Sequence, residues 1–270
     1  MDLGLRGRAC VVTGASRGIG LATSKLLCSE GADVLLVART ENRLVAAADE
    51  CAAAGERAGG RAESLVADIT EPEAADRILA EATERLGSLE VLVNNAGTAK
   101  WRDLDDVPDE DWYAAWELNV MAPMRLMKAA APLMRERGWG RIVNVSSTAG
   151  KRPSASMSEY SVAKAAELSL SRLYADRYAK DGVLVNAICP GPTKSDLWVA
   201  EGGLAEQSAE LSGLSGAEEA LATAAGGRPI ARLAEVEEIA AAIVFLCSAR
   251  ASYVAGAAWS VDGGTVPVII

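Results

Sequence analysis

Histidine is absent from this sequence, and its absence excludes several kinds of active site. Ser-His-Asp and Cys-His hydrolases use an imidazole as the general base, and histidine-ligated metal centres use it as a ligand. A dehydrogenase that relies on histidine as its acid is excluded in the same way. The reactive groups of this chain must therefore belong to other residue types.

Cysteine, positive charge and long apolar runs are also scarce. The five cysteines are odd in number and form no C-x-x-C pair, so we expect no metal site, no disulfide framework and a reducing, cytoplasmic compartment. Acidic residues outnumber basic ones by 37 to 27, which argues against nucleic acid or an anionic membrane as the main partner. Apolar stretches such as 34–38 and 239–247 fall far short of the roughly 18–20 residues that span a bilayer, and 1–8 holds no signal core.

What the sequence does contain is an alternation of short apolar runs with longer amphipathic stretches, such as the helix expected over 18–30. Apolar runs without internal alternation are typical of buried parallel strands. We predict strands at 9–13, 33–38, 62–67, 89–94, 141–146, 184–188 and 258–261. Joined by right-handed crossovers, they predict an α/β fold with a doubly wound, seven-stranded parallel sheet. Without a linker or composition break, residues 1–270 are expected to form a single domain.

The segment 194–232 departs from this alternation. It contains scattered glycines, many alanines and acidic residues, and no strand pattern. We expect an insertion of short helices over the site, of the kind that closes on substrate as a lid.

A glycine-rich loop follows the first predicted strand and opens the first helix. It runs Thr13-Gly14-Ala15-Ser16-Arg17-Gly18-Ile19-Gly20, a T-G-x-x-x-G-x-G pattern. Glycines there let the backbone approach a pyrophosphate, whose charge is met by N–H groups at the helix N-terminus. A tight turn is the simpler alternative, but strand, spacing and helix together favour a dinucleotide site.

The second predicted strand ends in Val37-Ala38-Arg39-Thr40, where an NAD-binding fold normally has an acid. With Arg17, Arg39 can bind a 2′-phosphate that a carboxylate would repel, so NADP(H) is favoured and NAD(H) stays possible. Alternatively, both arginines only solvate a helix start.

Two further strand ends carry candidate cofactor contacts. Asp68, followed by Ile69, is placed to accept a hydrogen bond from an adenine amino group, and the alternative is that it caps a helix. Asn95, Ala96 and Gly97 follow the fourth strand and either line the ribose or join the strand ends.

Tyr160 and Lys164 are four residues apart, so on a helix they share a face with Cβ atoms roughly 5–6 Å apart. A neighbouring ammonium favours the phenolate and lowers the pKa of the phenol from about 10. Ser147 lies thirteen residues upstream. The four-residue spacing alone is a weak signal, and the context described above strengthens it.

Taken together, these motifs resemble the short-chain dehydrogenase/reductase family over nearly the whole chain. The matching residues are 13–20, 94–97, Asn119, Ser147, Tyr160 with Lys164, Pro190-Gly191 and 261–264. The resemblance implies a one-domain Rossmann-like fold and hydride transfer between a nicotinamide and a carbonyl or alcohol carbon.

The resemblance also assigns roles. It implies that Tyr160 is the general acid in reduction, that Lys164 lowers its pKa and holds the nicotinamide ribose, and that Ser147 binds the substrate oxygen. Asn119 is implied to hold a water that links Lys164 to solvent. Pro190, Gly191 and the Thr193 hydroxyl are implied to lie at the nicotinamide carboxamide.

For the substrate, Trp101, Met157, Leu197 and Trp198 suggest a moderately bulky, partly apolar carbonyl compound, although each could belong to the core. The resemblance is strongest to 3-oxoacyl-carrier-protein reductases, whose acidic partner needs a basic rim. Arg137, Lys151 and Arg152 could supply it, but the lid is rich in acids, so a free ketone or secondary alcohol is favoured.

Several alternatives stay open at this point. They are an NAD(H)-dependent alcohol or polyol dehydrogenase, a lyase or epimerase that uses its cofactor transiently, and a cofactor-binding sensor without catalysis. The resemblance further implies a homotetramer packed through the helices that carry Asn119 and Tyr160, with the apolar tail 266–270 as an additional contact.

Overall fold

The computed structural model describes residues 2–267 and shows a parallel sheet of seven strands. The strands are β1 (Ala9–Thr13), β2 (Asp33–Ala38), β3 (Arg61–Val66), β4 (Val91–Asn94), β5 (Gly140–Val145), β6 (Val183–Pro190) and β7 (Ala258–Val261). Their order across the sheet is β3-β2-β1-β4-β5-β6-β7, and every neighbouring pair is parallel. The predicted doubly wound sheet is confirmed.

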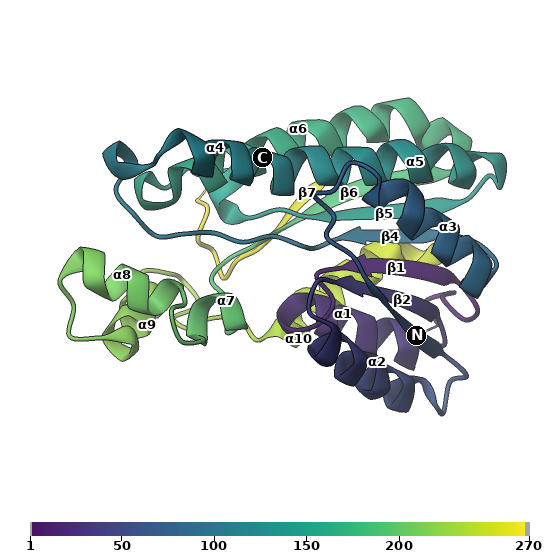
Figure 1. Ribbon diagram of the computed structural model, residues 1–270, viewed down its shortest axis with the longest axis horizontal. Coiled ribbons are helices and arrows are strands. Elements are labelled where there is room, and N and C mark those ends of the chain that lie inside the picture. Colours follow the sequence, from purple (N-terminus) through teal and green to yellow (C-terminus); the bar gives the residue numbers. More distant parts are fainter. Residues whose placement is uncertain (1, 268–270) are drawn as a thin grey trace.

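Helices cover both faces of this sheet (Figure 1). One layer contains α1 (Gly18–Ser29), α2 (Glu41–Gly55) and α10 (Val236–Cys247), and the other contains α3 (Ala74–Leu86), α4 (Asp109–Trp116), α5 (Ala122–Glu136) and α6 (Ser158–Tyr178). Successive strand residues enter opposite layers, as Val11 and Val12 of β1 do. Both strand faces are therefore buried, which explains the unbroken apolar runs.

The order of the strands reverses between β1 and β4. From β1 the chain builds outward through β2 and β3, and then crosses to β4 on the other side of β1. In such sheets ligands bind outside the carboxyl ends of the strands at the point of reversal. The glycine loop after β1 and the Asn95 turn after β4 meet at this point.

Strand bounds differ from the predicted ones by one or two residues at several ends. β4 begins at Val91, because Leu89 is buried in the core without belonging to the strand. β6 continues to Pro190, which pairs with Val261 of β7. Apolar character marks burial, and it fixes the ends of a strand only approximately.

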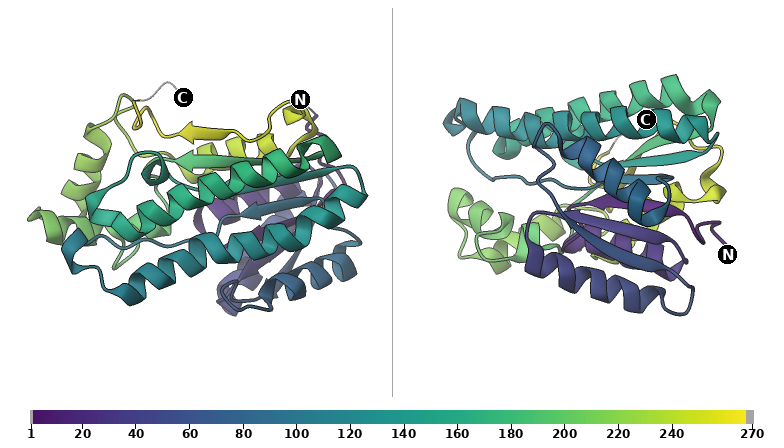
Figure 2. Two further views of the ribbon diagram at one scale, coloured as in Figure 1. Left: turned by 90° about the horizontal axis from the view of Figure 1, so that it is seen from above. Right: turned by 45° about the vertical axis from the view of Figure 1, so that its right-hand side comes forward.

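The segment expected to be an insertion forms α7 (Asp196–Val199), α8 (Leu204–Ser212) and α9 (Ala217–Gly226). These short helices stand together at one end of the molecule, apart from the sheet (Figures 1 and 2). Their helical structure agrees with the prediction, whereas closure on a substrate stays a prediction.

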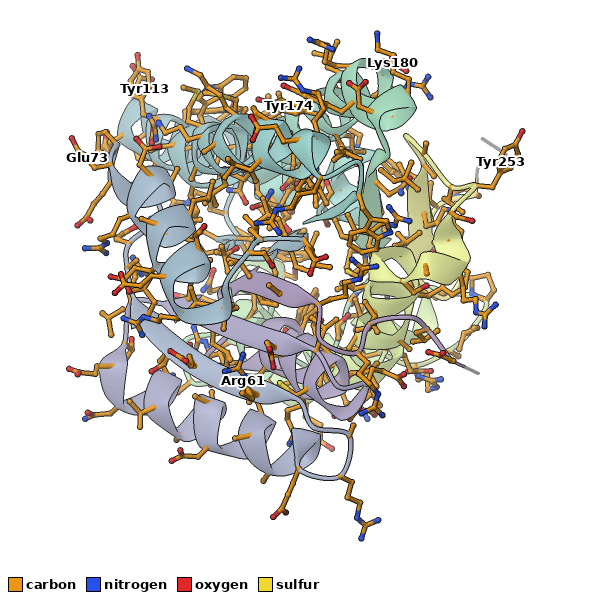
Figure 3. All side chains as sticks on the ribbon, turned by 90° about the vertical axis from the view of Figure 1, so that its right-hand side faces the viewer. Arg61, Glu73, Tyr113, Tyr174, Lys180 and Tyr253 are labelled. Atoms are coloured by element: carbon orange, nitrogen blue, oxygen red, sulfur yellow. The ribbon has the colours of Figure 1, made fainter. Side chains whose placement is uncertain are left out.

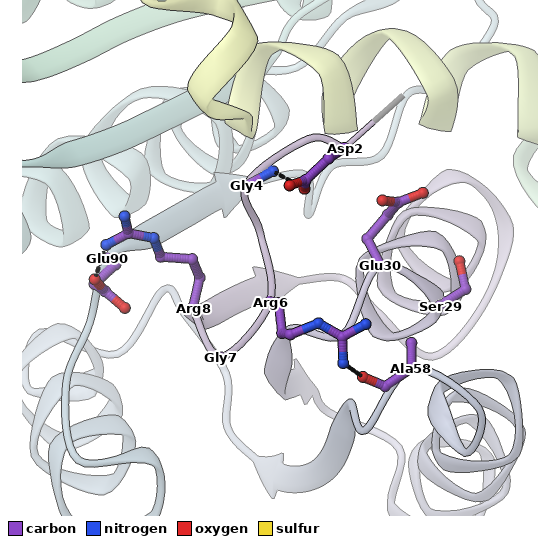
Figure 4. Close-up of a pocket in the computed structure, with 9 residues that line it drawn as sticks. All are labelled: Asp2, Gly4, Arg6, Gly7, Arg8, Ser29, Glu30, Ala58 and Glu90. Carbon is purple, nitrogen blue, oxygen red and sulfur yellow. Dashed lines mark hydrogen bonds and ion pairs between the residues drawn. The ribbon is translucent and has the colours of Figure 1, made fainter.

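A hollow of about 560 Å³ lies at the amino ends of β1 and β4 (Figure 4). Arg8 pairs there with Glu90, and Arg6 donates to the backbone oxygen of Ala58. Both guanidinium groups are thus engaged, and this edge is opposite to the point of reversal described above.

Within residues 2–267, no helix is both long and apolar enough to cross a membrane.

Candidate active site

The carboxyl ends of the central strands open onto a cleft of about 970 Å³. The cleft gathers residues from the ends of six strands, β1 to β6, from α6 and from the insertion. Eighteen of the predicted site residues line it: Gly14, Ser16, Arg17, Gly18, Ile19, Arg39, Thr40, Asp68, Ile69, Asn95, Ala96, Gly97, Ser147, Tyr160, Lys164, Pro190, Gly191 and Thr193. Gly20 and Asn119, the remaining two, lie behind this surface.

Gly20 and Gly14 let the loop fold tightly against the turn after β4. A Cβ atom on Gly20 would lie 2.4 Å from the backbone oxygen of Gly14 and 2.5 Å from Nδ2 of Asn95. Gly14 itself has φ of +65°, which favours glycine, and a Cβ there would lie 2.8 Å from Cα of Ala96. Gly20 therefore shapes the loop and is not itself among the residues that line the cleft.

Asn95 fastens the glycine loop to the sheet. Its Nδ2 donates to the backbone oxygens of Thr13 at 2.9 Å and Gly14 at 3.2 Å, and its own N–H donates to Oγ1 of Thr13 at 3.0 Å. The structure thus supports the role of joining the strand ends, while Asn95 also lines the cleft.

Three arginines line the cleft from the glycine loop, the end of β2 and the start of α2. Arg17 lies 3.4 Å from Asp196 of α7, and Arg39 lies 3.7 Å from Asp68. Burial raises the pKa of Asp68, but hydrogen bonds from Thr70 and the charge of Arg39 outweigh it, so the pKa is lowered overall. Arg43, which the sequence analysis missed, lines the cleft from the first turn of α2. Its position four residues after Arg39, just beyond the predicted second strand, was the available signal.

Tyr160, Lys164 and Ser147 meet on the β5 side of the cleft. The first two lie on α6, and Nζ of Lys164 is 5.8 Å from the centre of the Tyr160 ring. Ser147 follows β5 and caps a short 3-10 turn, where its Oγ accepts from the N–H of Ala149 at 3.1 Å. The sequence spacing has therefore brought a phenol, an ammonium and a hydroxyl to one place.

The electrostatics of Tyr160 differ from the expectation. Burial raises the pKa of its phenol, while the positive charge of Lys164 and a hydrogen bond with Ser147 lower it. Lys164 thus acts in the expected direction, but burial outweighs it and the net shift is upward, opposite to the expected one. Sequence spacing reveals a neighbouring charge, whereas it does not reveal how much water the fold removes.

Lys164 is held by two partners in the wall of the cleft. Its Nζ donates to the backbone oxygen of Val145 at 2.8 Å and lies 2.9 Å from Oε2 of Glu167. Burial lowers the pKa of Lys164, but the charges of Glu167 and Tyr160 outweigh it and raise the pKa overall. The sequence analysis did not identify Glu167, because an acid three residues after a lysine is also typical of a solvated helix face.

Asn119 lies in a π-helical turn, Glu117–Met121, between α4 and α5. Such turns widen a helix locally and are frequent at functional sites. Nδ2 of Asn119 donates to the backbone oxygen of Ala115 at 2.9 Å, whereas its buried Oδ1 has no hydrogen-bond partner among residues 2–267. A Cβ on Gly97 would lie 3.2 Å from this Oδ1 and 3.8 Å from Nζ of Lys164. The free acceptor therefore lies in the same part of the site as the ammonium.

The turn after β6 closes the cleft from the β7 side. Oγ1 of Thr193 donates to the backbone oxygen of Gly191 at 2.9 Å, and Thr193 forms a parallel bridge with Ala234 at the far end of the insertion. A Cβ on Gly191 would lie 2.8 Å from Cα of Asp262. The two ends of the insertion are thereby fixed to the sheet.

Apolar residues form the wall that faces the insertion. Met157, Tyr160 and Leu197 pack with Trp198 and Trp101, whose rings meet edge to face with centroids 6.0 Å apart. Oε1 of Gln207 on α8 accepts from the backbone N–H of Trp101 at 2.8 Å. The four residues expected to contact a substrate thus lie together next to Tyr160.

The basic rim suggested by the sequence does not form. Arg137 follows α5 and precedes β5, so it lies at the amino edge of the sheet, away from the cleft. Nζ of Lys151 donates to the backbone oxygen of Ala258 at 2.6 Å and to Oγ of Ser260 at 2.9 Å, which holds it against β7. Only Arg152 of the three lines the cleft.

Comparison with known proteins agrees with this geometry. A family model described as short chain dehydrogenase matches residues 8–203. The chain is 38% identical over 262 residues to a cis-4-hydroxycyclohexanecarboxylate dehydrogenase of Sinomonas cyclohexanicum, covering 97% of each protein. It is 33% identical over 262 residues to a 3-oxoacyl-[acyl-carrier-protein] reductase of Vibrio cholerae, covering 97% of this chain and 98% of that protein.

Among solved structures, the L-sorbose reductase of Gluconobacter frateurii, complexed with NADPH and L-sorbose, superposes with a TM-score of 0.90. The two chains are 37% identical, and the match covers 100% of each. The likeness therefore includes the sheet, the cleft and the insertion.

Proposed function

This chain belongs to the short-chain dehydrogenase family, and from that membership we propose that it is an NADP(H)-dependent oxidoreductase that interconverts a ketone and a secondary alcohol. The observation that carries the proposal is the meeting of Tyr160, Lys164 and Ser147 in the same cleft as the glycine loop. A proton donor next to a dinucleotide-binding loop is the arrangement that hydride transfer to a carbonyl requires.

The residues present fit a dinucleotide. Gly14 and Gly20 bring the loop to a close approach that a Cβ would block, and the N-terminus of α1 offers N–H groups to a pyrophosphate. The buried, unpartnered Oδ1 of Asn119 fits the implied water beside Lys164. Thr193 and the Pro190-Gly191 turn would hold the nicotinamide end.

Arg17, Arg39 and Arg43 support NADP(H) over NAD(H). All three line the cleft, and Arg39 and Arg43 follow the carboxyl end of β2, where a ribose-binding acid would otherwise stand. Guanidinium groups bind a phosphate through charge-assisted hydrogen bonds, whereas a carboxylate repels it.

The bound cofactor would supply the hydride, and the chain's residues would handle the proton and the substrate oxygen. In reduction, Tyr160 donates its phenolic proton to the carbonyl oxygen while Ser147 donates a second hydrogen bond to it. These two donors stabilise the charge that develops on that oxygen. Lys164 holds its position through Val145 and Glu167, and Asn119 connects it to water.

The apolar wall of Trp101, Met157, Leu197 and Trp198 supports a small, partly apolar substrate. The incomplete basic rim weakens the case for an acyl-carrier-protein substrate, because a strongly acidic partner needs several cations at the entrance. α7, α8 and α9 would act as the substrate lid over this wall.

The test is a spectrophotometric screen of ketones, diketones, sugars and acyl thioesters with NADPH and with NADH. We expect consumption of NADPH with at least one small ketone and a clear preference over NADH. The Arg39→Asp variant should shift that preference toward NADH, while Arg57→Asp, an exposed arginine in the turn after α2, should not. Product formation without net NADPH consumption would favour a lyase or epimerase, and cofactor binding without any turnover would favour a sensor.

A further inference from the structure

A buried carboxylate stands directly behind the lysine of the proposed site. Glu167 lies on α6 three residues after Lys164, and the exposed fractions of the two side chains are 1% and 3%. Nζ and Oε2 are 2.9 Å apart. Glu167 is not among the residues that line the cleft, so it reaches the site only through Lys164.

This pair determines where the ammonium of Lys164 points. An ammonium has three donors, and here Val145 and Glu167 accept two of them. One donor is left for the cleft. Glu167 is thus the charged partner of this buried ammonium.

The charges of Lys164 and Glu167 also act on the phenol of Tyr160. Within residues 2–267, the other titratable groups that act on this pair are Tyr160 on α6 and Cys189 on β6. Burial raises the pKa of Cys189 to about 11, so its thiol is neutral near pH 7. Among these groups Glu167 is the one carboxylate. Burial raises the pKa of its carboxyl, whereas the ammonium of Lys164 and a hydrogen bond with Ser146 favour the carboxylate. The negative charge of this carboxylate offsets the positive charge of Lys164 and disfavours the Tyr160 phenolate.

We propose that Glu167 is a positioning residue that fixes the Lys164 ammonium and, by offsetting its charge, keeps Tyr160 in the proton-donating phenol form at neutral pH. At neutral pH the site therefore favours carbonyl reduction, whereas alcohol oxidation needs the Tyr160 phenolate and so requires alkaline pH. Glu167 itself neither gives nor takes a proton in the reaction. The inference rests on the proposed function, because it concerns the same proton donor.

The main test compares Glu167→Gln with the wild-type protein. Glutamine keeps the shape and an acceptor for Lys164 but removes the negative charge. The pH midpoint of alcohol oxidation should fall by about 1–3 units, the range typical of one nearby charge. Glu167→Asp, which keeps the charge, should restore the midpoint toward that of the wild type. Asp176→Asn is the matched control, since Asp176 is an exposed, ion-paired carboxylate on the same helix.

A second measurement needs no turnover. Ultraviolet difference titration reports the ionisation of tyrosine, and subtracting the same titration of Tyr160→Phe isolates Tyr160. The same downward shift is expected in Glu167→Gln against this reference. If the wild-type protein oxidises no alcohol, the proposed function fails, whereas this titration still decides the role of Glu167.

The outcomes separate positioning from a merely structural role. Loss of rate at every pH with an unchanged midpoint, or a midpoint that moves upward, would overturn the proposal. Should Glu167→Gln fail to fold, Glu167→Met replaces the buried carboxylate with an apolar side chain of similar length, and the phenol titration is repeated on it. An unchanged Tyr160 titration in that variant would also overturn the proposal.

Discussion

At the scale of single residues, Tyr160 shows how burial and charge compete over one proton. Burial raises the pKa of its phenol, and Lys164 and Ser147 oppose that shift. Tyr160 therefore stays in the phenol form at neutral pH in the protein alone, and this is the form that donates a proton in carbonyl reduction. The sequence identified these three residues through spacing, but the balance between them depends on solvent exclusion that only the fold defines.

Replacing Tyr160 with Phe removes the proton donor and leaves the ring. General acid catalysis is typically worth about 10²–10⁴ in rate, so kcat should fall by that factor while NADPH affinity changes little. Steady-state kinetics with a ketone and fluorescence titration with NADPH measure the two quantities. A variant that keeps most of its turnover would remove Tyr160 from the mechanism.

Replacing Gly20 with Ala tests the loop rather than the chemistry. Its Cβ would lie 2.4 Å from the backbone oxygen of Gly14, so the loop must shift. We expect at least a tenfold weaker Kd for NADPH by calorimetry. Gly226→Ala is the control, because a Cβ there meets nothing within 4 Å and the backbone is helical. Equal affinities for both variants would show that the loop does not need this close approach.

At the scale of elements, the start of α10 is fixed by charge. The side chains of Glu235 and Glu238 form a capping box, and Arg232 contacts both carboxylate oxygens of Glu238 at 2.6 and 2.7 Å. These interactions lower the pKa of Glu238 from 4.5 to about 2. They join the end of the insertion to the helix layer below the sheet.

The sign of this shift predicts a pH-dependent contribution to stability. Because the pKa is lower in the folded state, Glu238 stabilises the protein above about pH 4.5, and this contribution is lost as the pH falls toward 2. Glu238→Gln should lower the melting temperature by a few degrees at neutral pH, and the difference from the wild type should shrink as the pH falls toward 2. Glu237→Gln, an exposed acid in the same turn, is the control. A difference that stays constant with pH would contradict the assignment.

The elements that could be predicted from the sequence are those whose pattern depends on burial alone. Both faces of β1 and β2 are covered, so their apolar runs mark them directly. The apolar wall could not be assigned in this way. Trp101 and Trp198 are far apart in the sequence, and only the fold of α7 and α8 over the turn after β4 brings their rings together. Glu167 was missed for a related reason, since helical spacing does not show which face is buried.

At the scale of the whole molecule, one outer surface carries unpaired apolar side chains. Tyr113 and Trp116 on α4 and Val162 and Leu173 on α6 are exposed, and Figure 3 shows Tyr113 projecting outward. α4 directly precedes the turn that holds Asn119, and α6 carries Tyr160. The expected tetramer packs through these same helices. The tail expected to add a contact is described only to residue 267, and 268–270 lie outside the described residues.

We expect this surface to be buried between copies of the chain. Leu173→Glu would place a charge in that contact and should shift the protein toward smaller species in sedimentation velocity. Val45→Glu changes an exposed apolar residue on α2, in the opposite layer, and should leave the assembly intact. A wild-type protein that sediments as a monomer would refute the expected tetramer.

The central position of β1 has a consequence for how the chain is made. β1 is complete at Thr13, but β4, its partner on one side, ends only at Asn94. At ribosomal rates of about 5–20 residues per second, that edge of β1 waits roughly 4–16 s for its partner, while β2 and β3 can already pair on the other side. During synthesis, the strand that carries the glycine loop thus exposes an unpaired apolar edge, which favours aggregation of the incomplete chain.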